Sequence, residues 1–270
     1  MKFIAKRLAL LGFIAIASLA ASPKETLSRA RALYNSAQYD AAIDAARDAG
    51  TTPELSDAAQ LVLARAYLER FRRSADENDR QAARDALKQV HAAELSADDR
   101  VELTIALGES LYFDGQAGAA AEQFELALSH ADRKQVARRE RLLDWWATAL
   151  DRQAQAGTDA VGRPLQARIV RRMDDELHAD TGAATVASYW LAAAARGSGD
   201  IERAWDAAIA GWVRTSQLGA RGETARAELD RLVTQAIIPD RARVIAPSAS
   251  DEAAATMRKQ WDALKRAWAS

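Results

Sequence analysis

Apolar residues recur along most of this 270-residue chain at the spacing of amphipathic helices. Between residues 24 and 130 small and large apolar positions also follow a fixed order. From Ala30, small or apolar residues lie at offsets 3, 9, 12, 16 and 19, and from Gly108 they lie at offsets 3, 7, 9, 12, 16 and 19. A small residue where two helices cross lets them approach, and a large residue beside it fills the groove between them. The pattern therefore predicts pairs of helices joined by turns.

Between the copies that start at Ala30 and Gly108 lies a less regular copy of the pattern. Ala64 is followed by Tyr67 at the expected offset of 3, but the pattern resumes only at Ala83, about seven residues late. The segment between them, residues 69–81, is polar and charged, which predicts either a longer loop or an extended helix. Three repeats thus account for residues 24–130.

The second half of the chain, residues 131–238, is predicted to be helical but follows the repeat only in part. Apolar stripes predict helices over 138–155 and 164–178, with a break over 157–164. The repeat returns over 185–212, where residues 197–200 form its turn. Further predicted elements are a helix over 220–238, a linker over 239–250 with two prolines, and a C-terminal helix over 251–270. That helix would cap the end of a stack of hairpins, because the last apolar face of such a stack needs a cover.

The order of small and aromatic positions resembles the tetratricopeptide repeat. The third copy meets that pattern best, with Leu107-Gly108, Leu111, Gly115, Ala120, Phe124 and Ala127. The first copy departs from it, since Ala37 replaces the turn glycine and Ala46 stands where an aromatic residue is usual. The resemblance implies an all-α fold, a right-handed α-solenoid of helical hairpins ending in a C-terminal capping helix.

The resemblance also implies an inner groove lined by the first helix of each hairpin. Some relatives clamp a peptide's terminal carboxylate there, but one corresponding position holds Glu109, which would repel a carboxylate. We therefore expect the groove to bind an extended or helical peptide segment. The alternative is that these side chains are merely solvated, or that the chain's own C-terminal helix fills the groove. The expected groove residues are Arg31, Tyr34, Asn35, Arg65, Leu68, Glu69, Glu109, Tyr112 and Phe113.

Composition narrows the classes of protein that this chain can belong to. With 49% hydrophobic residues it is not intrinsically disordered, and a net charge of −1 gives no general attraction to nucleic acid. The absence of cysteine excludes disulfide scaffolds, thiolate catalysis and cysteine-ligated zinc. The 64 alanines, 13 glycines and five prolines favour a chain that is almost entirely helical.

The first twenty residues match a secretory signal. Lys2, Lys6 and Arg7 precede the apolar run 8–17, and residues 18–20 supply small side chains for cleavage after Ala20. The alternative is a retained anchor, although the apolar stretch 8–21 is shorter than the ~20 residues that span a bilayer. We expect a cleaved, exported and periplasmic protein without a membrane span.

No arrangement of residues indicates catalysis or a metal. The three histidines form no metal-binding motif, and His178 near Asp174 and Asp175 is better explained as a solvated helix face. Residues 197–200 lack the lysine and the preceding strand of a phosphate-binding loop. We therefore expect no catalytic residue, no metal and no cofactor.

These observations together favour an adaptor or scaffold that binds a protein or peptide segment of another envelope protein. A structural subunit of an envelope or secretion assembly is the first alternative. The second is a small-ligand-binding protein or enzyme that uses the less regular half, 131–270.

Overall fold

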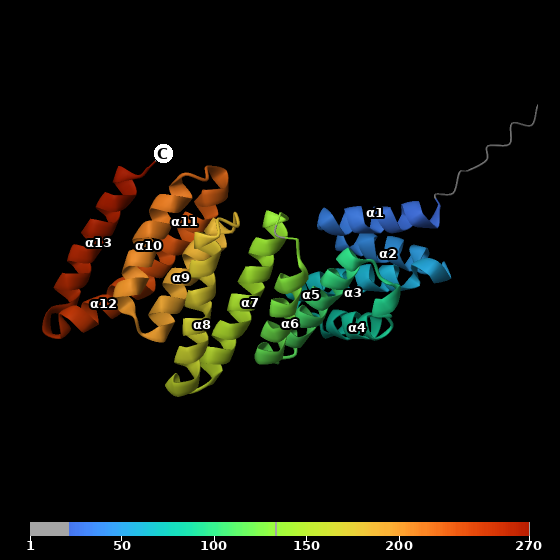
Figure 1. Ribbon diagram of the computed structural model, residues 1–270, viewed down its shortest axis with the longest axis horizontal. Coiled ribbons are helices and arrows are strands. Elements are labelled where there is room, and N and C mark those ends of the chain that lie inside the picture. Colours follow the sequence, from blue (N-terminus) through green and yellow to red (C-terminus); the bar gives the residue numbers. More distant parts are fainter. Residues whose placement is uncertain (1–21, 133, 270) are drawn as a thin grey trace, which may run out of the picture.

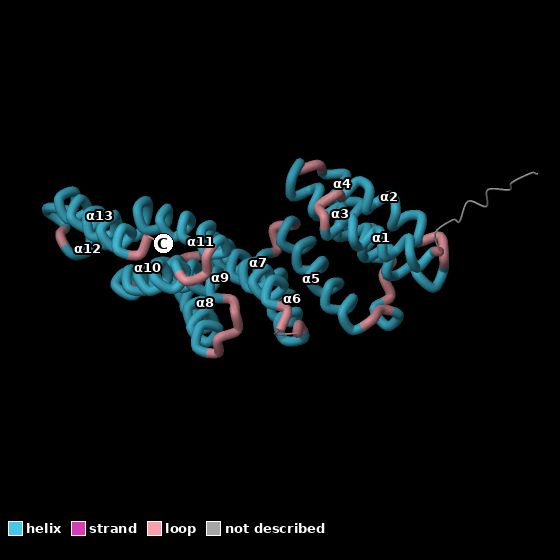
Figure 2. The backbone as a smooth tube through the Cα atoms, turned by 90° about the horizontal axis from the view of Figure 1, so that it is seen from above, coloured by secondary structure: helices cyan, strands magenta, loops and turns pink. Residues whose placement is uncertain are grey.

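The computed structural model describes residues 22–132 and 134–269, and every regular element in this part of the chain is helical. The helices follow one another in a row from α1 at one end to α13 at the other (Figure 1). Seen from above, α1–α4 lie at one end and α12 and α13 at the opposite end (Figure 2). The predicted all-α fold is confirmed. The expected cleaved signal, residues 1–20, lies outside the described residues.

The first half consists of three helical hairpins. Their helices are α1 (Pro23–Asn35) and α2 (Tyr39–Ala49), α3 (Ser56–Ser74) and α4 (Glu77–Lys88), and α5 (Ala97–Phe113) and α6 (Ala117–His130). The polar segment 69–81 is almost entirely helical, since it forms the end of α3 and the start of α4 with only two residues between them. At the turn position where the first copy lacks glycine, Ala37 adopts a left-handed conformation with φ of 58°.

The second half continues the stack. It contains α7 (Val136–Ala156), α8 (Asp159–His178), α9 (Ala184–Ser198), α10 (Ile201–Ser216), α11 (Ala220–Leu232), α12 (Ile238–Ile245) and α13 (Ser250–Ala267). Gly199 between α9 and α10 has a φ of 90°, as the predicted turn at 197–200 requires. A π-helical turn, Val233–Ile237, joins α11 to α12.

Two predicted breaks in the second half are wrong. The break over 157–164 is limited to two residues, since α8 begins at Asp159 and contains Pro164. At Gly162 an added Cβ would lie 2.9 Å from the carbonyl oxygen of Ala154, so the missing side chain allows α8 to fold closely onto α7. Tight packing between these helices outweighs the one backbone hydrogen bond that a proline removes.

The predicted linker over 239–250 is mostly the helix α12. Pro239 stands at the second position of that helix, directly after the π-helical turn Val233–Ile237, so the hydrogen-bond pattern of the helical run changes next to the residue that lacks an N–H. Ile238 and Ala242 are buried against the rest of the stack, and the burial of this apolar face favours a helix here. The real connection is the short segment 246–249 before α13.

Two hydrophobic cores run through the stack. The N-terminal core lies between Leu27 and Ala106, and the C-terminal core lies between Val101 and Trp261. Within the third hairpin, a Cβ added to Gly108 would lie 2.7 Å from the ring of Phe124. This confirms the expected pairing of a small residue on one helix with a large residue on the next.

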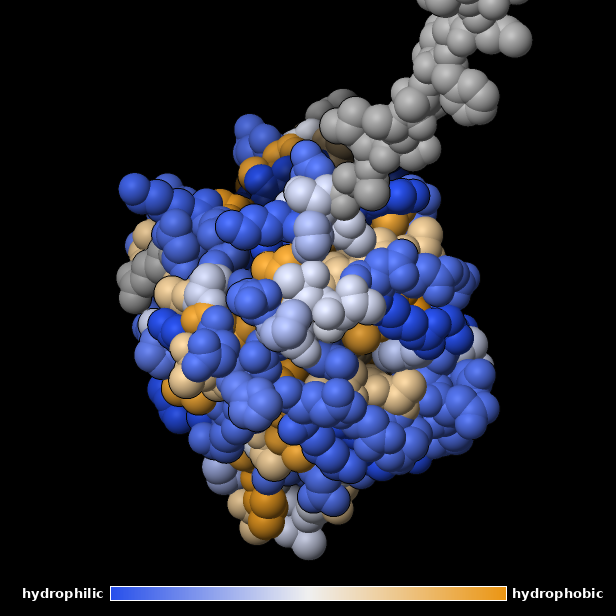
Figure 3. All heavy atoms as spheres, turned by 90° about the vertical axis from the view of Figure 1, so that its right-hand side faces the viewer, coloured by the Kyte–Doolittle hydropathy of each residue, from blue (hydrophilic) through white to orange (hydrophobic). Residues whose placement is uncertain are grey.

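The surface of the molecule is polar at the end formed by the N-terminal hairpins, where the apolar residues in view are scattered (Figure 3). A polar outer face is what the terminal unit of a helical stack requires. Among the described residues, no helix is both long and apolar enough to cross a membrane.

Candidate binding groove

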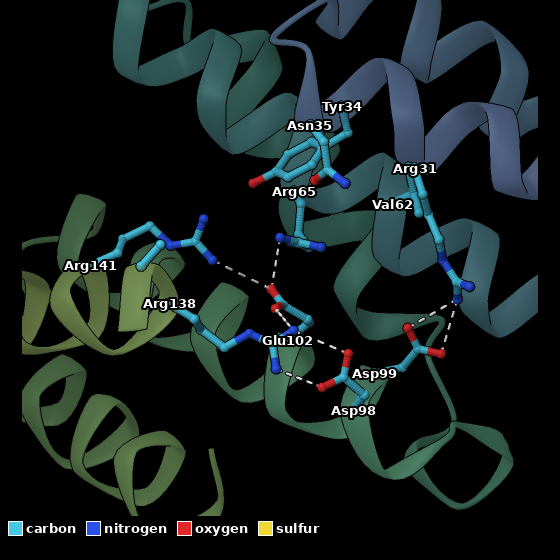
Figure 4. A pocket seen from close by; sticks show the side chains of 11 residues that line it. Arg31, Tyr34, Asn35, Val62, Arg65, Asp98, Asp99, Glu102, Arg138 and Arg141 are labelled. Carbon is cyan, nitrogen blue, oxygen red and sulfur yellow. Dashed lines mark hydrogen bonds and ion pairs between the residues drawn. The ribbon is translucent and has the colours of Figure 1, made fainter. Parts of the chain in front are cut away.

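A hollow of about 340 Å³ lies between the first helices of four successive hairpins, α1, α3, α5 and α7 (Figure 4). We call it the N-terminal hollow. Its position agrees with the expectation that first helices line an inner groove. The lining residues are Arg31, Tyr34 and Asn35 of α1, Val62 and Arg65 of α3, Asp98, Asp99 and Glu102 of α5, and Ala137, Arg138 and Arg141 of α7.

Helical spacing explains why these side chains converge. On each helix the lining residues are neighbours or lie three or four positions apart, which places them on one face. α1 contributes residues 31, 34 and 35, and α7 contributes 137, 138 and 141. Each helix also buries an apolar face in a core, so its polar face is left to the groove.

Ion pairs between helices hold the side chains of the hollow in place. Glu102 of α5 lies 2.7 Å from a guanidinium nitrogen of Arg65 on α3 and 2.9 Å from one of Arg138 on α7. Arg31 of α1 donates to both carboxylate oxygens of Asp99, at 3.0 Å each. Since each pair joins two different helices, the hollow is organised before any partner arrives.

Arg138 also donates to Asp98, and this hydrogen bond lowers the pKa of the Asp98 carboxyl. Asp98 therefore stays ionised well below neutral pH. The four guanidinium groups of the hollow face three carboxylates, which leaves one positive charge.

Tyr34 and Arg65 form a stacked pair in the wall of the hollow. The guanidinium carbon of Arg65 lies 4.2 Å from the centre of the Tyr34 ring, within the range of a cation–π contact. Burial raises the pKa of Tyr34 to about 12, so its phenol keeps its proton at physiological pH. The wall thus offers a neutral hydroxyl beside a fixed positive charge.

Glu109 is a buried carboxyl group beside the hollow, with 5% of the residue exposed. Within the described residues it forms no ion pair, although charges of Arg65 and Arg141 act on it favourably. Burial is the main cause that raises the pKa of Glu109 to about 7, and repulsion from Glu69 is the second cause. The charge beside the hollow therefore changes near neutral pH.

The structure brings four of the nine predicted groove residues into the hollow, namely Arg31, Tyr34, Asn35 and Arg65. Glu69 lies close enough to affect the charge of Glu109 and is held by Arg72. Leu68 is 1% exposed and belongs to the N-terminal core, so it cannot contact a partner. The repeat register placed Leu68 in the groove, but its apolar side chain faces the neighbouring helices instead.

Tyr112 and Phe113 lie in an aromatic cluster outside the hollow. Tyr112 is 5.2 Å from Trp145 and Phe113 is 5.1 Å from Phe71, measured between ring centres. Tyr112 packs against the C-terminal core and Phe113 against the N-terminal core, so the cluster joins the two cores. Replacing these two residues would test packing between the halves rather than binding of a partner.

The sequence prediction assigned the wrong residues of α5 to the groove and missed the contribution of α7. Asp98, Glu102, Arg138 and Arg141 belong to it, although α7 lies in a hairpin that lacks the repeat pattern. The spacing of Arg138 and Arg141 at the start of the predicted helix 138–155 was the available signal. The pairing of Arg138 with Glu102 depends on how two hairpins stack, which local patterns do not encode.

The alternative in which the chain's own C-terminal helix fills the groove is excluded for the described helix. α13 packs at the far end of the stack from α1 (Figure 1). The N-terminal hollow is therefore not filled by α13. The described residues also contain no group of three or more His, Asp or Glu side chains arranged to hold a metal ion.

No protein-family model matches the chain, and comparison with curated proteins and with solved structures gave no match. Fold and site alone thus define the class, an all-α stack of helical hairpins with a polar, pre-organised hollow on its first helices.

Proposed function

We propose that this protein is an exported adaptor of the tetratricopeptide-repeat type, a right-handed solenoid without catalytic activity that binds a segment of another envelope protein. The observation that carries the proposal is the N-terminal hollow. Four successive first helices line it, and ion pairs fix its side chains before binding. A pre-organised groove across several hairpins suits an elongated ligand, because one peptide segment can contact every hairpin in turn.

The charge of the hollow favours an acidic side chain in that segment. Arg31 and Arg141 keep 41% and 44% of their side-chain surface exposed. Arg141 lies 3.9 Å from Glu102, the longest ion pair of the hollow, so its guanidinium remains available. A partner carboxylate placed between these arginines would find donors on two sides, with the Tyr34 hydroxyl and Asn35 beside it.

A site-specific crosslinker tests this assignment in living cells. A photoreactive amino acid at Asn35, on the rim of the hollow, is expected to capture one discrete envelope protein. The same amino acid at Ala119, exposed on α6, is the positional control and should not capture it.

The variant Arg141→Glu separates specific binding from mere proximity. We expect it to abolish the crosslinked product, because it places a negative charge where the acidic side chain enters. Arg171→Glu is the matched control, since Arg171 is exposed on α8 away from the hollow. A product that persists in Arg141→Glu would overturn the proposed groove.

Export is part of the proposal and rests on the signal-like residues 1–20. N-terminal sequencing of the protein recovered from the periplasmic fraction should begin at Ala21. An unprocessed chain in the membrane fraction would instead support the retained anchor, and a cytoplasmic protein would contradict export.

One observation favours a structural subunit as a second candidate. Val244 and Ile245 at the end of α12 are 64% and 51% exposed, which is unusual for neighbouring large apolar residues. A permanent neighbour would cover them. Light scattering on the purified mature chain distinguishes the candidates, because a stable monomer argues against a subunit that requires its neighbours.

A further inference from the structure

Two adjoining hollows lie on the second half of the stack, between α7, α8, α9 and α11. Their volumes are about 440 Å³ and 380 Å³, and they share Tyr189, Trp190 and Leu232 as a common wall. We call them the C-terminal hollows. α7 borders them and also the N-terminal hollow, since it supplies Asp144 here and Arg141 there.

Three carboxylates of the C-terminal hollows are not neutralised. Asp144, Asp151 and Glu228 form no ion pair with any of residues 22–132 or 134–269, whereas the carboxylates of the N-terminal hollow are all paired with arginines. Asp144 accepts a 2.8 Å hydrogen bond from Trp190 Nε1, and Asp151 accepts from the side-chain amides of Gln155 and Gln166. These donors are uncharged, so the negative charges remain.

The cations that line the same hollows do not compensate for these charges. Arg163 is paired with Asp159 and Arg196 with Asp240. Arg231 has no ion pair in the described part of the chain and offsets one carboxylate. The hollows therefore carry a net charge of about −2 from these groups.

Titration of Tyr189 and Glu228 reflects this negative charge. Burial raises the pKa of Tyr189, and Glu228, Asp151 and Asp144 raise it further. Burial and the nearby Asp144 likewise raise the pKa of Glu228. A positive charge at this place would relieve the repulsion.

Gln166 supplies an independent sign that a hydrogen-bond donor is missing. It lines the smaller C-terminal hollow, on the other side of the shared wall from Asp144 and Glu228, is 5% exposed, and its Oε1 has no hydrogen-bond partner among the described residues. Its Nε2 donates to Asp151 at 2.7 Å, so exchanging the two amide atoms would set two acceptors against each other. The unpartnered atom is therefore an acceptor.

We propose that the C-terminal hollows bind a basic side chain of the partner segment, a guanidinium or ammonium group that packs on Tyr189 and is held by Asp144 and Glu228. Tyr189 offers an aromatic face, which favours cations, and the free acceptors call for a donor. The proposal rests on the proposed function in that a protein partner presents this side chain. A segment that carries an acidic residue and, at some distance along it, a basic residue would then match both hollows.

A small probe tests the site without knowledge of the partner. The mature chain, labelled with ¹⁵N, is titrated with N-acetylarginine amide, and the Trp190 indole N–H signal is followed after its assignment with Trp190→Phe. N-acetylcitrulline amide, which has nearly the same shape but no charge, is the ligand control. We expect a saturable shift with the arginine probe and none with citrulline.

Two substitutions connect the response to the carboxylates. Asp144→Asn with Glu228→Gln should weaken binding of the arginine probe about tenfold, as expected for the loss of two partly exposed ion pairs. Glu223→Gln, exposed on the same helix as Glu228 and outside the hollows, is the matched control. If the double variant does not fold, Glu228→Gln alone gives the same test, because Glu228 is exposed.

Equal responses to arginine and citrulline, or unchanged binding in the carboxylate variants, would overturn the proposal. Failure here is distinct from failure of the N-terminal hollow. Arg31→Glu on α1, which lines the N-terminal hollow and neither of the C-terminal hollows, should leave the arginine titration unchanged, and the Asn35 crosslink does not depend on Glu228.

Discussion

The carboxyl group of Glu109 illustrates how one side chain can set the properties of a groove. From the sequence it is a negative charge that repels a peptide carboxylate. In the structure it is buried next to Glu69, and its pKa is raised to about 7. The negative charge of Glu109 opposes the positive charge of the four arginines of the hollow, so binding of the proposed acidic side chain should strengthen as the surroundings become acidic and Glu109 is neutralised. Burial of this kind depends on tertiary packing, and the sequence pattern of one helix does not reveal it.

Glu109 should also make stability depend on pH. Its folded-state pKa is raised, so its contribution is complete below the unfolded value of 4.5 and is lost as pH rises to about 7. The full loss amounts to about 3 kcal/mol by the conversion of 1.36 kcal/mol per pH unit. Glu109→Gln removes this titration, so the melting temperature of the variant relative to the original protein should be higher at pH 8 than at pH 5.

Glu94→Gln is the control for that comparison, because Glu94 is exposed and has no ion pair among the described residues. Thermal melts of both variants at the two pH values give the result. A difference between variant and original protein that is the same at pH 5 and pH 8 would show that Glu109 is ionised in the folded protein throughout this range.

Pairs of helices are where the sequence pattern was most informative. The crossing of α5 and α6 depends on Gly108, whose missing side chain leaves room for Phe124. The offset pattern identified both residues, since the same spacing recurs in other hairpins. Pro164 and residues 239–245 were misjudged because proline is a local signal, whereas the burial of Ile238 and Ala242 is decided by neighbouring hairpins.

Gly108→Ala should destabilise the hairpin by about 1–3 kcal/mol, the usual cost of forcing extra atoms into a filled core. Gly118→Ala is the matched control. Its Cβ would meet only the flexible end of Gln153, which can move aside, so its stability should hardly change. Chemical denaturation of both variants measures the difference, and equal stabilities would contradict the close crossing at Gly108.

At the scale of the whole molecule, each hairpin contacts mainly its neighbours, so damage should remain local. Trp261 of α13 is 1% exposed, packs 5.3 Å from Trp212 and donates to Asp230. The sequence placed it in the apolar stripe of a capping helix, which agrees with the structure. Assembly of the binding groove was less predictable, because Arg138 and Arg141 join it through stacking of a hairpin that lacks the repeat.

Trp261→Ala should lower the free energy of unfolding of the C-terminal hairpins by about 3–5 kcal/mol, as removal of a buried tryptophan does. Hydrogen exchange followed by mass spectrometry should then show faster exchange in α10–α13, with α1–α4 unchanged. Faster exchange over the whole chain would instead indicate a single cooperative unit.

The division of the apolar interior into two cores has a consequence for the order in which the molecule forms. Side chains of the first core, and those packed against it, all lie between Leu27 and Phe113, whereas the second core needs residues as late as Trp261. A chain delivered from its N-terminus, by a ribosome or through a translocation channel, can complete the first core while the rest is still emerging. The folded N-terminal hairpins then provide a surface against which each later hairpin can pack as it emerges.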